Sequence, residues 1–256
     1  WRAPLDNDLG NLMHIRTASW KNVDKELTLE YFQRSLANNV AKVKVITEHK
    51  TTGSRITMTY RIYGNGLIDI HQHLKTGNKR LPELPRFGMK MTLPKDFNRL
   101  TWFGRGPHES YWDRKTSAAV KVFSGSVWDQ TYPYVRPQET GNKTDVRWMA
   151  LDNGTIGLLA IGQPTFDGSV HNYPYSDLDY VPAGRLHGKL DLKPKNQVDW
   201  LIDYRQTGVG GDNSWGARPH SEYTLTGKSI SYEYHFYLRP FVKNDDLMTL
   251  SKLKIK

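Results

Sequence analysis

The sequence predicts an all-β fold of antiparallel strands, because alternation of apolar and polar residues is its dominant pattern. In residues 56–62 the even positions are apolar and the odd ones polar, and residues 230–238 alternate in nearly the same way. Such alternation is typical of half-buried antiparallel strands. Turn motifs between the alternating segments and the lack of a long 3.6-residue pattern support the same fold class.

Eight further segments have strand character. We expect them at residues 27–34, 39–48, 66–75, 85–93, 99–103, 155–162, 166–172 and 198–206. Gly64-Asn65-Gly66 and Asp152-Asn153-Gly154 predict hairpin turns between strands. Short helices are expected around residues 113–118 and 243–252, the latter after a plausible cap at Asn244-Asp245-Asp246.

The chain is interpreted as one large domain at residues 1–240 and a C-terminal extension at 241–256, which contains the second short helix. Its 256 residues suffice for a sizeable core. Residues 102–149 and 207–220 are rich in Gly, Pro, Tyr and Trp, and we expect them to form functional loops or contact surfaces. The chain begins with Trp1 rather than Met, which we interpret as a piece of a longer protein.

Composition excludes several classes of protein. The absence of cysteine excludes disulfides and thiolate chemistry, but it does not distinguish bacterial cytoplasm from periplasm. No stretch of about 18 apolar residues exists, so we expect no membrane span. The net charge of +10 is spread along the chain, apart from the basic tail at 252–256. Because nucleic-acid binders usually concentrate charge on one face, we expect no nucleic-acid partner.

No pair of acidic residues in the sequence has the signature of a glycosidase active site. Such a site needs two carboxyl groups about 5–5.5 Å apart for retention or about 6.5–9.5 Å for inversion. The acidic residues of the irregular segments each have a Pro, Gly or Arg nearby, namely Glu109, Asp113, Glu139, Asp145, Asp212 and Glu222. We therefore expect them to brace loops, and we expect no catalytic residue in this chain.

Two other features allow a functional and a structural interpretation. His71 and His73 lie on one face of a predicted strand with Asp69, a set that could hold a metal, but this face is opposite to apolar residues and is more simply solvated. We expect no metal site there. Trp215 lies in a loop rich in Gly, Asp and Asn, where its ring could stack on a pyranose or pack within the loop.

Four segments, in this order, resemble the C-terminal domain of family 2 glycoside hydrolases of the β-galactosidase type. Residues 2–8 are similar to the entry motif of that domain, and residues 102–114 contain G-R-G-P-x-E-x-Y-x-D-R. Residues 132–148 and the loop 208–215 are similar to two later motifs. The resemblance runs from residue 2 to about 238, and the four motifs together are highly specific.

The resemblance implies a large antiparallel β-supersandwich similar to galactose mutarotases. It implies a parent enzyme that cleaves terminal β-galactosides with retention, using two glutamates on an upstream TIM barrel. Mg²⁺ and Na⁺ would bind mainly outside this chain. Trp215 would stack on the sugar, with Asp212 and Asn213 beside it. A homo-oligomeric parent is compatible with the resemblance.

The resemblance also assigns roles to two further sets of residues. A mobile segment at the mouth of the sugar pocket would contain Arg2, Asp6, Asn7 and Asp8. The residues that brace loops or dock on the barrel would be Arg105, Glu109, Asp113, Arg114, Glu139 and Arg147.

Two alternatives stay open at this point. The first is an autonomous sugar epimerase of the mutarotase type, for which His171, His187 and Glu139 could supply the acid–base groups. The second is a free-standing carbohydrate-binding module.

Overall fold

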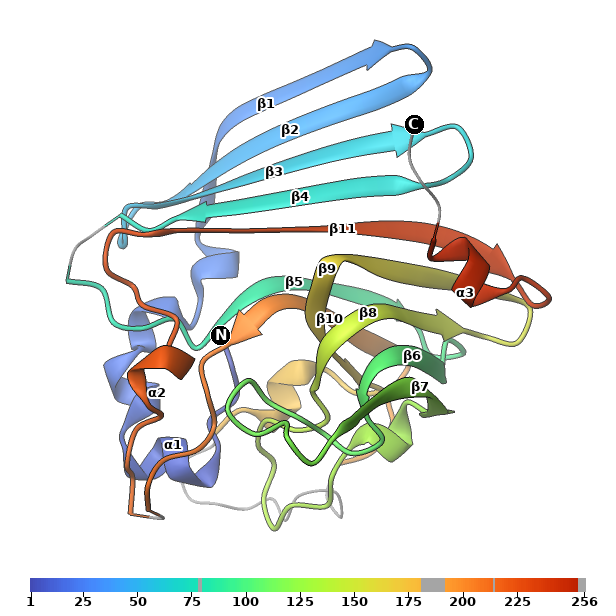
Figure 1. The fold of residues 1–256 in the computed structure, drawn as a ribbon. Coiled ribbons are helices and arrows are strands. Elements are labelled where there is room, and N and C mark those ends of the chain that lie inside the picture. Colours follow the sequence, from blue (N-terminus) through green and yellow to red (C-terminus); the bar gives the residue numbers. More distant parts are fainter. Residues whose placement is uncertain (78–79, 181–191, 214, 253–256) are drawn as a thin grey trace.

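The computed structural model describes residues 1–77, 80–180, 192–213 and 215–252, which form two layers of β-strands (Figure 1). All pairs of neighbouring strands run antiparallel. The predicted all-β antiparallel class is therefore confirmed. None of the helices in this described part is both long and apolar enough to cross a membrane.

The strands belong to one hydrogen-bonded sheet that folds over on itself. Within the described residues its main path runs in the order β1 (Leu27–Ala37), β2 (Val40–His49), β3 (Ser54–Tyr63), β4 (Ile68–Lys75), β11 (Ser231–Val242), β9 (Ile156–His171), β8 (Lys143–Asp152), β6 (Arg99–Gly106) and β7 (Ala119–Ser126). A branch leaves this path at β9 and contains β10 (Gln197–Gln206) and β5 (Arg86–Pro94).

Strand β9 connects the two layers. Its first half, up to Gln163, pairs with β11, and its second half, from Asp167, pairs with β10. β1–β4 and β11 consequently form the upper layer of Figure 1, while β5 and β10 lie beneath it. The main hydrophobic core contains side chains of both layers, among them Ile70 and Phe236 above and Trp200 below.

The predicted alternation is clearest in β11, where Tyr234, Phe236 and Leu238 are buried and their odd-numbered neighbours are not. The hairpin predicted at 64–66 joins β3 to β4, and the one at 152–154 joins β8 to β9. The predicted strands are confirmed, with one difference. Segments 155–162 and 166–172 are two halves of a single strand, Ile156–His171, which changes its pairing partner from β11 to β10 between Gln163 and Asp167.

The middle of the chain is more regular than the sequence suggested. β7 lies inside segment 102–149, which had weak alternation, and β8 begins within it. β8 is buried on both faces over most of its length, so its two faces do not differ in polarity. The helix expected at 113–118 is wrong: Tyr111 and Arg114 form an isolated β-bridge, and a turn follows.

The N-terminal 25 residues form short helical turns that the sequence did not predict. They are α1 (Asp6–Gly10), α2 (Met13–Arg16), η1 (Ala18–Trp20) and η2 (Val23–Lys25). Each is too short to show a helical period, and Leu12, between α1 and α2, has a left-handed backbone with φ of 60°. Tertiary contacts therefore hold these turns in place, as described below.

The C-terminal segment packs on the outer face of the sheet. β11 continues past residue 240 to Val242, and α3 (Leu247–Leu250) follows. Asp246 caps this helix by accepting hydrogen bonds from the backbone N–H groups of Met248 (3.1 Å) and Thr249 (3.3 Å). Residues of α3 pack with Phe241 in a separate hydrophobic cluster. The division of the chain at residue 240 stays a prediction.

We expect Phe236→Ala to lower the free energy of unfolding by about 3–5 kcal/mol, because it leaves a cavity between the two layers. Urea unfolding of the chain measures this change. Val120→Ala on the exposed part of β7 is the control, with an expected cost below about 0.5 kcal/mol. Equal effects of the two changes would contradict the assigned core.

Candidate functional site

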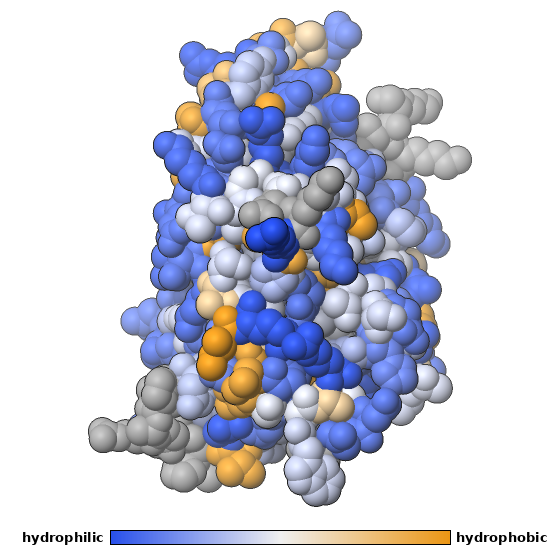
Figure 2. Space-filling model, turned by 90° about the vertical axis from the view of Figure 1, so that its left-hand side faces the viewer, coloured by the Kyte–Doolittle hydropathy of each residue, from blue (hydrophilic) through white to orange (hydrophobic). Residues whose placement is uncertain are grey.

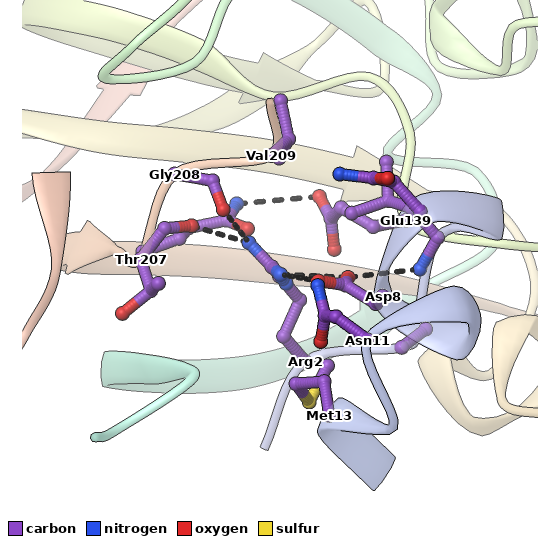
Figure 3. Close-up of polar contacts among 12 residues, drawn as sticks. Arg2, Asp8, Asn11, Met13, Glu139, Thr207, Gly208 and Val209 are labelled. Atoms are coloured by element: carbon purple, nitrogen blue, oxygen red, sulfur yellow. Dashed lines mark hydrogen bonds and ion pairs between the residues drawn. The ribbon is translucent and has the colours of Figure 1, made fainter. Parts of the chain in front are cut away.

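A buried ion pair attaches the N-terminal segment to the end of β10. The guanidinium of Arg2 donates to both carboxylate oxygens of Asp8, at 2.8 and 2.7 Å (Figure 3). It also donates to the backbone carbonyl oxygens of Thr207 and Gly208, the latter at 3.2 Å. Both charged side chains are almost completely buried. Arg2 therefore connects α1 directly to the loop that leaves β10.

Asp8 also orders the start of α1. Its carboxylate accepts a hydrogen bond from the backbone N–H of Leu5, at 3.0 Å. Burial raises the pKa of Asp8 above its usual value, although Arg2 and the N–H of Leu5 act in the opposite direction. The charged form consequently depends on Arg2.

The loop after β10 is held from two sides. Asp113 accepts hydrogen bonds from the backbone N–H groups of Val209 (3.0 Å) and Gly210 (2.7 Å). From the other side, the amide of Asn7 donates to the carbonyl oxygens of Gly210 (3.2 Å) and Ala217 (3.0 Å). These contacts fix both ends of the segment that carries Trp215.

The tip of this loop presents the ring of Trp215 to solvent. The side chain oxygen of Asn213 accepts a hydrogen bond from the backbone N–H of Trp215 at 2.9 Å, and Asp212 pairs with His220 at 2.8 Å. Trp215 itself is 88% exposed. The structure therefore brings the predicted residues together, with Asp212 and Asn213 in contact with the loop itself and the ring of Trp215 turned to solvent.

The helical turns lie against this loop. A methyl group built on Gly10 would come within 3.1 Å of the Cα atom of Gly216, so the two backbones are in contact. Figure 2 shows apolar side chains gathered on the lower half of the face that carries α1 and α2. Leu12 and Ile15 of this segment are 54% and 64% exposed. An exposed apolar surface thus accompanies the exposed ring.

A cleft of about 250 Å³ lies next to the Arg2–Asp8 pair. A second ion pair lines it, in which Arg16 donates to Glu83 at 2.5 and 3.0 Å. Arg218, from the Trp215 loop, is also part of its wall. The cleft therefore lies between the N-terminal turns and the loop.

The residues predicted for the pocket mouth differ in exposure. Arg2 and Asp8 are buried and structural in their contacts. Asp6 is exposed, pairs with Arg136 and accepts from the side chain of Gln138 at 3.0 Å. Of the charged residues predicted for the pocket mouth, Asp6 is the one whose carboxylate is accessible to a ligand.

The charged side chains of the central motif brace a long loop, partly within the motif and partly with distant residues. Arg105 pairs with Asp145 at 2.5 Å. Glu109 accepts from Arg114 at 2.6 Å and from the backbone N–H of Gly141 at 2.8 Å. Asp113 accepts from the backbone of the Trp215 loop. Each predicted bracing carboxylate of this motif is thus engaged.

Arg147 joins the same brace. Its guanidinium donates to the backbone carbonyl oxygen of Asp145 at 2.6 Å and lies 5.5 Å from the ring centre of Phe103.

Glu139 lies in a buried charged cluster beneath this brace. It accepts hydrogen bonds from Arg86 (3.0 Å), from Gln206 (3.2 Å) and from the hydroxyl of Tyr175. Arg86 also pairs with Asp203 at 2.9 Å. The cluster contains two carboxylates for one arginine, so it is short of positive charge. Arg86 and Asp203 were not predicted as site residues, because each occupies an ordinary polar position in the alternating pattern of a predicted strand.

Burial perturbs two neighbouring carboxyl groups in this part of the core. It raises the pKa of Asp203 to about 7, although Arg86 opposes the shift. It raises the pKa of Asp167 to about 8, and the nearby Asp203 adds to the effect. Asp167 faces Asp203 across the β9–β10 ladder.

The groups proposed for an epimerase do not line an open site. His171 is fully buried, lies 3.3 Å from the hydroxyl of Tyr173, and has a pKa lowered by burial to about 3. Glu139 is also fully buried. His187 lies outside the described residues. No observation therefore favours this alternative.

The His71–His73–Asp69 set does not form a metal site in the structure. Asp69 pairs with Arg61 (2.9 Å) and with His235 (2.5 Å), so its oxygens are engaged. Among the described residues no three His, Cys, Asp or Glu side chains converge as metal ligands.

Comparison with known proteins identifies sequence relatives. Residues 1–238 match the family described as β-galactosidase small chain. The β-galactosidase of Priestia megaterium is 38% identical over 241 residues, which are 94% of this chain and 23% of that protein. The β-galactosidase of Lactobacillus delbrueckii subsp. bulgaricus is 32% identical, over 88% of this chain and 22% of that protein. The chain spans less than a quarter of the length of these relatives.

Solved structures resemble the chain in fold. The family 36 α-galactosidase AgaB of Geobacillus stearothermophilus aligns with 84% of this chain and 28% of its own, at 8% identity and a TM-score of 0.42. The galactose 1-epimerase of Lactobacillus acidophilus aligns with 82% of this chain and 66% of its own, at 6% identity and a TM-score of 0.42. At such identities the likeness concerns the fold alone.

We expect Arg2→Met to lower the free energy of unfolding by about 3–5 kcal/mol, because it leaves Asp8 buried without its partner. Thermal or urea unfolding measures the loss. Arg136→Met is the matched control: its partner Asp6 is exposed, so the expected cost is at most about 1 kcal/mol. A loss for Arg2→Met no larger than the control's would show that the buried pair is not needed.

The pH dependence of stability tests the buried carboxyl groups. The unfolded chain releases the proton of Asp167 near pH 4, whereas the folded chain keeps it up to about pH 8. The stability that this group contributes is therefore complete below pH 4 and is lost as the pH rises to 8, by an amount on the order of 3–5 kcal/mol.

Asp167→Asn should accordingly reduce the fall in unfolding free energy between pH 4 and pH 8, measured by urea unfolding. Asp96→Asn, at an exposed carboxylate, is the control. A pH profile of Asp167→Asn parallel to that of the unaltered chain would refute the shift.

Proposed function

Because the chain belongs to the β-galactosidase small-chain family, we propose that it is the non-catalytic C-terminal domain of a retaining β-galactosidase. The parent enzyme hydrolyses terminal β-D-galactosides. In it, the chain completes the sugar pocket with Trp215 and docks on an upstream TIM-barrel domain. The two catalytic glutamates lie on that barrel, outside this chain, and the bound Mg²⁺ and Na⁺ lie mainly outside it.

The exposed ring of Trp215 carries this proposal. A tryptophan side chain is normally buried because of its large apolar surface, yet this one is 88% exposed on a loop whose backbone is fixed by Asp113 and Asn7. A rigid loop with a free flat ring suits stacking on the apolar face of a pyranose. Because the loop is already fixed, it loses little conformational freedom when a sugar binds, so little of the stacking energy is spent on ordering it.

The surroundings of the ring support docking. Leu12 and Ile15 are exposed on the neighbouring turns, and Tyr132 and Val135 are exposed on the loop that Arg136 connects to α1. Contiguous exposed apolar residues with a polar rim are typical of interaction surfaces. An upstream domain placed against them would close a pocket over Trp215.

The hydrogen bonding of the carboxylates supports the proposal that this domain is not catalytic. Glu109, Asp113 and Glu139 each accept hydrogen bonds from two or more partners within the domain. A general acid or nucleophile needs a carboxyl group that faces the substrate. These engaged carboxylates support the proposal that the bond-breaking groups belong to another domain of the parent enzyme.

In the full-length polypeptide, Trp215→Ala should lower kcat/KM for a chromogenic β-galactoside by about 10- to 100-fold, which corresponds to about 1–3 kcal/mol of lost apolar contact. Steady-state kinetics measure the effect, and Trp215→Phe should recover most of it. Tyr31→Ala, at an exposed aromatic residue on β1, is the control. An unchanged kcat/KM in Trp215→Ala would refute the pocket role.

The isolated chain should show no turnover of the same β-galactoside at concentrations where the full-length polypeptide is active. Galactose titration followed by tryptophan fluorescence distinguishes the proposed function from the remaining alternative. Tight saturable binding by the isolated chain would indicate a free-standing carbohydrate-binding module, whereas half a pocket should bind galactose very weakly. Turnover by the isolated chain would contradict the proposed division of labour.

A further inference from the structure

A basic groove of about 390 Å³ lies on the outer face of the upper layer, far along the sheet from Trp215. It is lined by side chains of β2, β3, β4 and β11, which lie side by side in Figure 1, namely Lys42, Lys44, Thr59, Arg61, His71 and His235. The proposed galactosidase function uses none of these residues.

The strand register arranges the groove as two rows of side chains. One row across the four strands contains Lys44, Thr59, His71 and His235, which are successive cross-strand partners. The next row begins with Lys42 and Arg61, followed by Asp69. Positions two residues apart on a strand share a face and lie about 7 Å apart. The two rows therefore present cationic groups at two points about 7 Å from each other.

The single carboxylate in these two rows is already engaged. Asp69 accepts hydrogen bonds from Arg61 at 2.9 Å and from His235 at 2.5 Å. Burial opposes its ionisation, but the hydrogen bonds from His235 and Arg61 outweigh burial and lower the pKa of Asp69. It is thus a fixed anion that orients Arg61 and His235, and it does not neutralise the lysines.

Lys42 and Lys44 have no acidic partner among the described residues. The two lysines lie two residues apart on the same face of β2, so both ammonium groups border the groove. The ring of His71 stands edge-on to that of His235, with centroids 5.6 Å apart, and both side chains line the groove. The nearest further carboxylate by register, Glu233, lies one row beyond on β11.

We propose that this groove binds a small polyvalent oxyanion of the diphosphate type, one anionic group on each row. Lys44, His71 and the hydroxyl of Thr59 hold one group, and Lys42 with Arg61 holds the other. Charge-assisted hydrogen bonds from several cations to phosphate oxygens supply the binding energy. The groove between β2 and β11 provides the space for the anion.

The test uses the full-length polypeptide and inorganic pyrophosphate, with isothermal titration calorimetry at low salt. We expect saturable binding of one pyrophosphate per chain. The double variant Lys42→Gln/Lys44→Gln should weaken it about tenfold or more. The matched control, Lys95→Gln/Lys121→Gln, removes two exposed lysines from other parts of the surface and should bind as the unaltered protein does.

Inorganic phosphate should bind more weakly than pyrophosphate, because it reaches only one row. The ring signals of His71 and His235, observed by NMR and assigned with His71→Gln, should shift during the titration. Equal weakening in both double variants would show diffuse attraction to a basic surface and overturn the proposal. So would the absence of saturable binding, including the case in which another part of the polypeptide covers the groove.

Discussion

The arrangement of the N-terminal turns and the Trp215 loop depends on the buried pair of Arg2 and Asp8. Two charges removed from water must satisfy each other and their remaining hydrogen bonds, and here they do so by joining α1 to the carbonyl groups of Thr207 and Gly208. The N-terminal turns, which have little core of their own, are thereby fixed to the end of β10. Once they are fixed, Asn7 reaches the Trp215 loop, and Gly10 packs against Gly216.

At this end of the molecule, one set of residues braces the loops and another set is exposed to solvent. The carboxylates of Glu109, Asp113 and Glu139 are engaged in bracing, while the ring of Trp215 and the side chains of Leu12 and Ile15 are exposed at the same end. The exposed ring is the feature on which the proposed sugar stacking rests. Assigning the chemistry to a neighbouring domain agrees with the chain spanning less than a quarter of its relatives.

The sequence predicted the strands with two distinct faces, because β11 and β4 alternate in polarity as they alternate in burial. It missed β8, which is buried on both faces, and the N-terminal turns, which long-range contacts of Arg2 and Asn7 hold in place. The predictions for Trp215 and the bracing residues came from motifs. The sequence did not show which residue Arg105 would bind. It binds Asp145 rather than Glu109 or Asp113, because the loop folds back and brings together two residues that are forty positions apart. Arg86 and Asp203 carried no motif at all.

The most direct test of this account is a double-mutant cycle between Arg2 and Trp215 in the full-length polypeptide, with kcat/KM for a β-galactoside as the readout. If Arg2 acts by holding the loop that presents Trp215, the single variant Arg2→Lys should lower kcat/KM. The same change should cause little further loss of kcat/KM in a protein that already carries Trp215→Ala. Fully additive losses would contradict the account, because they would show that the buried pair and the exposed ring act independently.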